Sequence, residues 1–521
     1  MDLHGFLNTW GISLAVFLPL VGAVVLMAMP SQAARTNGAH VVAGAFTLVP
    51  LLIVIWMATQ FAYGSGRMQF EVDASWIPTI GARYHVGVDG ISFGLFVLTF
   101  LITFLCIIYS LRWMPEPRNP RAFFALILLL TTGMAGTFVS LDLVLFFIFW
   151  ELVLVPMYFL IAVWGGPRRE YSAIKFFLYT LFGSIFMLLG FIALYLRSDI
   201  APGPAVVHSF DIVRLSALGQ AGAWSPLFGH LVFAGLFLGF AIKVPMWPFH
   251  TWLPDAHTEA PTVGSVILAA ILLKMGTYAF VRISLPILPT TAKIWAPAIG
   301  ILAAIAIIYA SLACLAQTDM KRLIAFSSVG HMGFVMLGIA TLTERGINGA
   351  IVGMIVHGLI TGMLFFLAGS VHERFHTREI SRLGGMAIMT PWLGGLLAYS
   401  SIASLGLPGL AGFWGEFLSL LGAYNPARVL SGQTTLFRVL LTLGVVGTLL
   451  TAGYFLWLLQ RVNLGRPKEE WEGHTFKDVL AEEWLSWAPL LVLILLVGVY
   501  PAVILRVTTP AVHAVARLFG G

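Results

Sequence analysis

The stretch LFLGFAIKVPMWPFHTWLPDAH, Leu236 to His257, decides what kind of fold this chain adopts. It opens as an apolar helix, but Lys243 lies inside the apolar run and Pro245 and Pro248 follow it. A lysine at the centre of a bilayer costs about 2.5–3.5 kcal/mol, and intramembrane charges therefore mark functional sites. Proline interrupts a helix because it lacks an N–H donor and clashes with the preceding turn. The stretch predicts a broken membrane helix with a functional lysine beside the break.

The composition extends this prediction to the whole chain. Of its 521 residues, 59% are hydrophobic and only 10% are charged, and the mean hydropathy is +0.93. Soluble domains carry about 25% charged residues, so the composition excludes a soluble globular protein. The net charge of +6 falls largely in short loops and indicates no nucleic-acid partner. Cys106 and Cys314 lie in apolar runs and are predicted to be packed thiols, because two such residues supply neither a disulfide framework nor a cluster-ligand set.

Apolar runs near the spanning length of about 20 residues predict fourteen transmembrane helices. These runs are 9–29, 39–61, 89–113, 121–140, 142–164, 171–197, 228–253, 260–284, 292–316, 321–342, 346–372, 386–424, 434–461 and 485–507. The seventh run is interrupted by the two prolines already named. The twelfth is too long for one helix, and we expect two half-helices around Pro408 and Gly409. The first run lacks a preceding basic region, which predicts a retained span and not a signal peptide.

These spans define an all-α polytopic membrane protein formed by a single integral membrane domain, residues 1–521. The two broken helices are five spans apart, which predicts two five-helix repeats at 121–284 and 292–461, flanked by helices in 1–113 and 485–521. Because five is odd, the second repeat enters the membrane inverted. Inverted repeats with broken helices are a transporter architecture in which the breaks mark the ion path.

The loop charges predict how the chain is oriented in the membrane. Lys and Arg, Arg35 among them, are modestly more frequent in the loops that follow odd-numbered spans. Cytoplasmic loops carry an excess of these residues. The odd-numbered spans are therefore predicted to end in the cytoplasm, with both termini on the outer side.

Few ionisable residues lie well inside the predicted spans, and they belong to different helices. They are Glu151, Lys243, Lys274, His331, His357 and Glu416. Glu151, Lys274 and His331 lie near the middle of their spans by residue count. Burial favours neutral lysine and a nearby carboxylate favours the charged form, so such groups switch between holding and releasing a proton. Histidine titrates near neutrality. The set predicts a proton relay along the centre of the membrane.

Structural interpretations stay open for several of these side chains. Glu151 and Lys243 would also suit an ion pair that holds two helices together. His331 and His357 would suit hydrogen-bonded histidines of a helix-packing core. Lys175, at the start of the sixth span, would reach the membrane surface with its long side chain.

Five segments resemble the antiporter-like membrane subunits of respiratory complex I, the proton-translocating NADH-quinone oxidoreductase. They are FWELVLVPMYFLI, KFFLYTLFGS, KVPMWPFHTWLPDAHTEAPT, LLKMGTY and DMKRLIAFSSVGHMGF. The family has L, M and N types and includes subunits of multisubunit cation/proton antiporters and membrane-bound hydrogenases. Glu416 stands where L, N and most antiporter relatives carry lysine. The chain is therefore most similar to the M type, with the two antiporter and hydrogenase subunit classes as alternatives.

The resemblance implies a role for each buried ionisable residue. It implies an ion pair of Glu151 with Lys243, Lys274 as the central lysine, His331 and His357 as the connecting relay, and Glu416 as the exit-side acid. Quinone reduction elsewhere in the complex would drive proton transfer. The expected partners are other membrane subunits, including L- and N-type neighbours, in a bacterial inner membrane. No dinucleotide loop, cysteine cluster or flavin motif is found, so no cofactor or metal is expected in this chain.

Two motifs suggest a different chemistry. HERFH, His372 to His376, matches the H-E-x-x-H pattern of zinc proteases, and an intramembrane protease is therefore a remote alternative. The sequence offers no convincing third ligand. His250, Asp255 and His257 are residue types that bind metals, but a polar cluster at the cytoplasmic mouth of the broken helix is the favoured interpretation.

Overall fold

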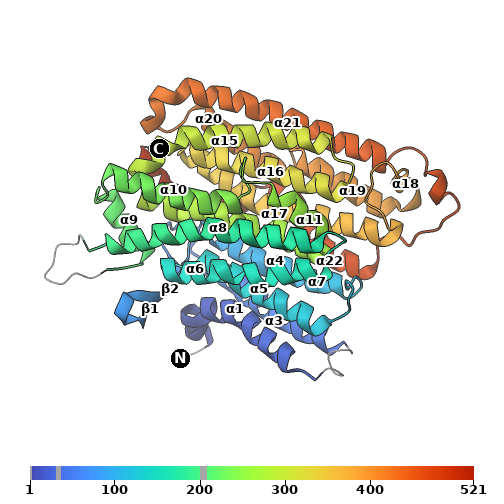
Figure 1. Cartoon of the computed structure of the whole chain (residues 1–521), viewed down its shortest axis with the longest axis horizontal. Coiled ribbons are helices and arrows are strands. Elements are labelled where there is room, and N and C mark those ends of the chain that lie inside the picture. Colours follow the sequence, from blue (N-terminus) through green and yellow to red (C-terminus); the bar gives the residue numbers. More distant parts are fainter. Residues whose placement is uncertain (1–2, 31–36, 200–207, 521) are drawn as a thin grey trace.

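The computed structural model describes residues 3–30, 37–199 and 208–520 of a predominantly helical chain. In Figure 1 the long helices lie side by side across the view, with β1 (Gln69–Ile77), β2 (Ala82–Val88) and α9 (Ile212–Gln220) at one end and α18 (Met386–Met389) at the other. Fourteen helices in the described ranges are long and apolar enough to cross a membrane. This confirms the predicted polytopic membrane fold. Arg35 lies outside the described residues.

The first half of the chain forms the blue and green helices of Figure 1. They are α1 (Leu3–Ala28), α3 (Gly38–Gln60), α4 (Phe93–Ser110), α5 (Pro120–Val139), α6 (Leu143–Leu152), α7 (Leu154–Trp164) and α8 (Arg169–Leu196). The fifth predicted span, 142–164, is confirmed as one span of 22 residues, Leu143–Trp164. Val153, between α6 and α7, keeps helical φ and ψ angles of −75° and −21°. Pro156 disturbs the hydrogen bonding there, because proline cannot donate to the carbonyl four residues earlier.

The predicted break in the seventh span is confirmed. α10 (Pro226–Lys243) ends at the lysine itself, and α11 (Trp252–Glu259) begins beyond both prolines. The next span alternates α-helix with two wider π-helical segments. Its parts are α12 (Thr262–Ile267), η2 (Leu268–Leu272), α13 (Leu273–Ala279), η3 (Phe280–Ser284) and α14 (Leu285–Ile287). Such π-helical segments are frequent at functional sites.

The second half contains the other predicted break. Its helices are α15 (Pro289–Leu315), α16 (Met320–Ala340), α17 (Glu344–Phe375), α19 (Pro391–Ser404), α20 (Gly412–Tyr424) and α21 (Thr434–Val462). The break between α19 and α20 contains Pro408, as expected. It also contains Gly406 and Gly409, whose φ angles of 82° and 97° are readily adopted only by glycine. The predicted inverted repeat of the two halves stays a prediction.

The predicted last span, 485–507, is wrong as a single helix. The chain instead forms α22 (Ala481–Val499) and α23 (Ala502–Ala516). Pro501 separates them, because the residue before a proline is driven out of the helical conformation. The helices long enough to span therefore differ from the predicted fourteen: Ala502–Phe519, which extends α23 by a last 3₁₀ turn, is added, whereas α19 and α20 are each too short. Short 3₁₀ segments complete the described structure at η1 (Pro78–Ile80), η4 (Arg428–Gln433), η5 (Glu469–Trp471) and η6 (Arg517–Phe519).

A β-hairpin between the second and third spans departs from the expected all-α chain. β1 and β2 are antiparallel. Val86 of β2 bridges to Ser140 after α5, and Asp142 bridges to Asp211 before α9. We therefore call the end of the bundle formed by β1, β2 and α9 the hairpin face, and the end at α18 the opposite face (Figure 1). The start of α1 also lies at the hairpin face, where His4 contacts Gln60 at the end of α3.

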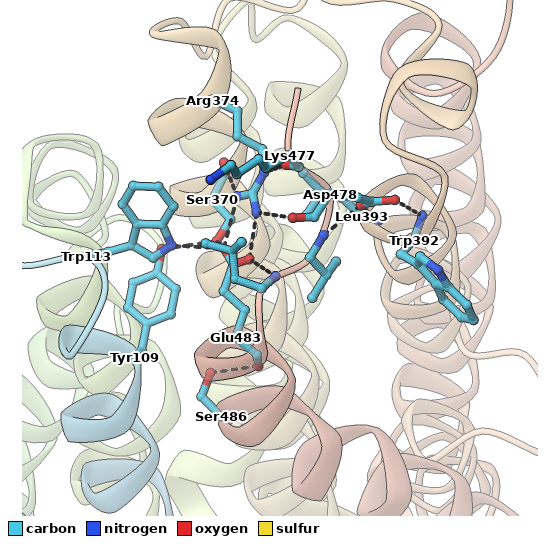
Figure 2. A network of polar contacts seen from close by, with 12 residues as sticks. Tyr109, Trp113, Ser370, Arg374, Trp392, Leu393, Lys477, Asp478, Glu483 and Ser486 are labelled. Carbon is cyan, nitrogen blue, oxygen red and sulfur yellow. Dashed lines mark hydrogen bonds and ion pairs between the residues drawn. The ribbon is translucent and has the colours of Figure 1, made fainter. Parts of the chain in front are cut away.

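A buried polar network holds helices together at the opposite face (Figure 2). Arg374, near the end of α17, pairs with Glu483 of α22 at an Nη2–Oε2 distance of 2.6 Å. Ser370 and Trp113 also donate to Glu483, at 2.6 and 2.9 Å. Asp478 accepts two backbone N–H bonds at the start of α19. The first turn of α22 and the segment before it therefore link α17, α19 and the chain just after α4.

Both cysteines are buried and free, as predicted. Cys106 lies in α4, and Cys314 lies near the end of α15.

Candidate functional site

Four of the six predicted residues form one row across the centre of the helix bundle. Lys274 of α13 places its Nζ 2.7 Å from Nδ1 of His357 on α17. The His357 ring lies 5.6 Å, centroid to centroid, from the ring of His331 on α16. His331 Nδ1 lies 3.0 Å from Oε1 of Glu416 on α20. The row therefore leads from the helix that follows the first break to the half-helix that follows the second.

Lys274 has no solvent exposure, and its ammonium has two polar partners. One is the His357 imidazole, and the other is the backbone carbonyl of Ala269 in the π-helical segment η2. A π-helical segment changes the regular hydrogen-bonding register of a helix, so its carbonyl can accept from a side chain. The backbone therefore positions the lysine beside the imidazole. Among the described residues, no carboxylate contacts the Lys274 ammonium directly.

His357 offers its second ring nitrogen to a cavity. Nε2 is buried and has no hydrogen-bond partner within the described ranges. The cavity has a volume of about 30 Å³ and is lined by His331, His357, Ser404 and Glu416, together with apolar residues. Buried polar atoms almost always have a partner, often an ordered water. The lining is mainly apolar, but the cavity has room for about one or two water molecules beside these polar side chains.

Glu416 is held at the end of the row by side chains from two helices, α16 and α21. His331 contacts its Oε1, and Thr448 of α21 donates to Oε2 at 3.4 Å. The other His331 nitrogen lies 3.0 Å from the Ser404 hydroxyl at the end of α19. Gly353 and Gly415 allow α17 and α20 to approach closely, since a Cβ on Gly415 would lie 2.6 Å from the Gly353 Cα.

Glu151 and Lys243, the predicted ion pair, are near each other but not in direct contact. No N–O distance of 4.0 Å or less joins these two described residues. The Lys243 ammonium instead lies 5.4 Å from the Trp150 ring centroid and 5.9 Å from that of Phe176. Glu151 Oε1 is buried without a hydrogen-bond partner. The two charges interact electrostatically across this gap.

Lys175 does not extend freely to the surface. Its Nζ lies 2.7 Å from Oδ2 of Asp255 in α11, and Arg322 lies 3.8 Å from the other carboxylate oxygen. His257 points elsewhere: it stacks on Phe365 at 4.4 Å, and both of its ring nitrogens lack partners within the described chain. The predicted cluster of His250, Asp255 and His257 is therefore not one ligand set.

The HERFH motif lies in the last turns of α17. Its central Arg374 belongs to the network in Figure 2. In the described part of the chain, no three or more His, Cys, Asp or Glu side chains are grouped so as to hold a metal ion. The motif gives the protease alternative no structural support.

Sequence reasoning missed several residues that complete the site. Ser404 and Thr448 carry no charge and lie far from Glu416 in the chain, so nothing in the sequence marked them. Tyr278 and Arg282 had a detectable signal, because they follow Lys274 at intervals of four residues and therefore lie on the same side of the helix.

Comparison with known proteins identifies the class to which this fold and site belong. The family described as NADH:quinone oxidoreductase/Mrp antiporter, transmembrane, matches residues 140–450. The chain belongs to this family, which confirms the resemblance found in the sequence.

Two relatives that match most of the chain carry the same name. Subunit M of NADH-quinone oxidoreductase from Rickettsia typhi is 40% identical over 501 residues, covering 95% of this chain and 96% of that protein. The subunit M of Rhodobacter capsulatus is 42% identical over 506 residues, covering 96% and 95%. A chain of respiratory complex I from Thermus thermophilus with bound NADH has a TM-score of 0.84 and 30% identity, covering 98% of this chain and 100% of that one.

Proposed function

We propose that this chain is an M-type, proton-translocating subunit of a bacterial NADH-quinone oxidoreductase. The observation that supports it most strongly is the row of titratable side chains from Lys274 to Glu416. Intramembrane ionisable groups that face the interior of a helix bundle are typical of proton relays. The near full-length similarity to proteins named subunit M agrees with this function.

The first transfer runs from Lys274 to His357. The ammonium donates to Nδ1 of a neutral imidazole at 2.7 Å, which places the imidazole's own proton on Nε2. Transfer to Nδ1 makes the imidazole cationic, and it then releases the Nε2 proton toward the cavity. Histidine relays a proton in this way because its two nitrogens exchange the roles of donor and acceptor.

The second transfer crosses the cavity to His331 and ends at Glu416. The two rings have no direct hydrogen bond, so water in the cavity would connect His357 to the Ser404 hydroxyl, whose Oγ lies 3.0 Å from His331 Nε2. His331 then passes a proton from Nδ1 to the Glu416 carboxylate. Ser404 and Thr448 keep the imidazole and the carboxyl group oriented. Release from Glu416 against the membrane potential requires about 2.3 kcal/mol per 100 mV.

Glu151 and Lys243 control this row electrostatically. The Lys243 ammonium lies over aromatic rings, which stabilise a cation less than a carboxylate in direct contact does. A shift of Glu151 toward Lys243 would stabilise the ammonium, and a shift away would favour proton release. A change in this distance therefore switches the charge at one end of the relay.

The chain performs no redox chemistry and holds no cofactor under this proposal. Quinone reduction in other subunits supplies the energy, and L- and N-type subunits lie beside it in the bacterial inner membrane. The hairpin face is outside and both termini lie on that side, as the loop charges predict. A subunit of a cation/proton antiporter is the second candidate, and the proteins that co-purify with the chain distinguish the two.

Interruption of the row tests the proposed function. His357→Leu should leave the complex assembled but lower the number of protons moved per NADH oxidised, measured in inside-out vesicles. Ser311→Ala is a matched control, because Ser311 is buried and bonds only within α15. An assembled His357→Leu complex with the wild-type ratio would refute the relay.

A further inference from the structure

The helix that carries Lys274 also carries two polar side chains on the way to the hairpin face. Tyr278 and Arg282 follow at intervals of four residues, and both are buried. Arg282 donates from Nε to the Tyr278 hydroxyl at 3.2 Å and pairs with Asp89 at the start of α4. These groups form a second polar series that begins one helical turn from the central lysine.

This second series ends at a cavity at the hairpin face. The cavity has a volume of about 400 Å³ and is lined by Asp89 and Arg282, together with residues near β1 and from α9 and α23. The same Asp89 carboxylate accepts N–H bonds from Ile91 and Ser92, at 2.9 and 3.2 Å. The ion pair therefore lies between this cavity and the interior that contains Lys274.

The chemistry of the second series prevents proton conduction. A guanidinium has five N–H donors and no acceptor, and it stays protonated in proteins, so it cannot receive a proton and pass it on. The Tyr278 hydroxyl donates to the Phe138 backbone carbonyl at 3.0 Å. A hydroxyl both accepts and donates, so the block lies at Arg282 and not at Tyr278. A chain of hydrogen bonds from the cavity stops at Arg282.

The row from Lys274 to Glu416 differs in this respect. Its amine, its two imidazoles and its carboxyl group all both accept and release protons. Of these two polar series in the described part of the chain, only the row from Lys274 to Glu416 contains exclusively groups that exchange protons. A fixed arginine charge in a narrow path also repels protons and cations, as in water channels that exclude them.

We propose that the Arg282–Asp89 pair is a proton barrier that closes the hairpin-face side of Lys274. A proton on Lys274 then leaves only through His357, and protons from the cavity do not return to the lysine. This inference rests on the proposed function, because a barrier matters only if Lys274 holds a transferable proton. Arg282 acts through its fixed charge and its pairing with Asp89, and it does not itself transfer protons.

Passive proton leak tests the barrier. The assembled complex is reconstituted into liposomes with quinone reduction inhibited, a pH difference is imposed, and its decay is followed with a pH-sensitive dye. Arg282→His supplies a side chain that still pairs with Asp89 but exchanges protons, and it should speed the decay several-fold. Adding Lys274→Met should return the decay to the wild-type rate. Wild-type decay in an assembled Arg282→His complex would overturn the proposal.

A second variant covers the case in which Arg282→His does not assemble. Arg282→Gln combined with Asp89→Asn removes the fixed charge that repels protons from this path, so water could carry protons past these positions and the variant should also leak. Wild-type decay in this double variant would equally overturn the barrier. Arg438→His is the control, because Arg438 is exposed and its Nε donates to a backbone carbonyl. It should not leak.

The leak assay also separates this inference from the proposed function. The leak is measured without NADH, and pumping is measured separately with NADH. Normal pumping by a Lys274→Met complex would therefore refute the relay, whatever the leak assay shows. A working relay combined with an unchanged leak in both Arg282 variants would refute only the barrier.

Discussion

His331 and Glu416 lie 85 positions apart in the chain, yet their side chains meet at an Nδ1–Oε1 distance of 3.0 Å. His331 belongs to the continuous helix α16, whereas Glu416 belongs to the half-helix α20 after a break with two positive-φ glycines. A half-helix at such a break can move relative to a continuous helix. The His331–Glu416 contact is therefore the point at which movement of α20 would connect or disconnect the relay from its outlet.

Replacing Glu416 tests whether its carboxyl group transfers protons. Glu416→Gln keeps the shape and most hydrogen bonds but cannot exchange a proton, so NADH-driven proton uptake into vesicles should fall strongly. Glu416→Ala should block it as well, and Glu416→Asp should retain part of it. Complex assembly is checked separately by native gel. Full uptake in Glu416→Gln would mean that the acid only braces the broken helix.

Lys274→Arg tests whether the central lysine must titrate. Arginine keeps the positive charge but stays protonated, so it cannot deliver a proton to His357 Nδ1. The complex should assemble and lose most of its pumping. The measurement is proton uptake per NADH oxidised. Thr277→Val, one turn from the site, is a control that should change the ratio little, and wild-type pumping by Lys274→Arg would exclude a titrating role.

Glu151→Gln and Lys243→Ala test electrostatic control without direct contact. Since no ion pair joins the two side chains in this structure, neither should be needed for stability in the way that a buried pair is. Each variant should therefore assemble, with a melting temperature near the wild-type value, but should pump poorly. A large loss of melting temperature with normal residual pumping would instead indicate a structural role.

The sequence alone predicted most of the fold because membrane insertion leaves clear signals. Apolar length located the spans, and prolines in apolar runs located the breaks beside Lys243 and Pro408. The division of the last span at Pro501 was missed, because the apolar run continues on both sides. The β-hairpin was missed because β1 and β2 lie in a loop outside the spans, where apolar length gives no signal.

The candidate site was predicted as a set of residues but not as a geometry. Buried charges are rare enough in a membrane helix to identify Lys274, His357, His331 and Glu416 without a structure. Their order along the row depends on how close the helices pack, which residue counting cannot give. For the same reason the separation of Glu151 from Lys243 was unexpected.

His85 predicts a pH-dependent attachment of the hairpin. Its ring contacts Asp211 at 2.5 Å and Glu71 at 2.7 Å. Burial opposes protonation of His85, but the hydrogen bonds to Asp211 and Glu71 outweigh burial and raise its pKa from 6.5 to about 9. A raised histidine pKa stabilises the fold fully below about pH 6.5, and this stabilisation is lost as pH rises through about 9.

The expected contribution of His85 is on the order of 2 kcal/mol, reduced because Glu71 is partly exposed. Hydrogen exchange of the β1 and β2 amides, corrected for intrinsic rates, should show less protection as pH rises over this range. His85→Asn removes the titrating group, so its protection should not follow the same pH dependence. Equal pH profiles for wild type and His85→Asn would show that another group is responsible.

Arg374 and Glu483 predict a large stability effect that is independent of the relay. Their side chains are only 5% and 0% exposed, and the ion pair joins α17 to α22 (Figure 2). Arg374→Ala leaves the Glu483 carboxylate buried without its charge partner, which costs about 3–5 kcal/mol. Arg118→Ala is the matched control, because its pair with Glu116 is 73% and 74% exposed, and such surface pairs contribute about 0–1 kcal/mol. Thermal unfolding of the purified complex should therefore show a much lower melting temperature for Arg374→Ala than for Arg118→Ala. Similar melting temperatures for the two variants would show that the network in Figure 2 does not hold the helices together.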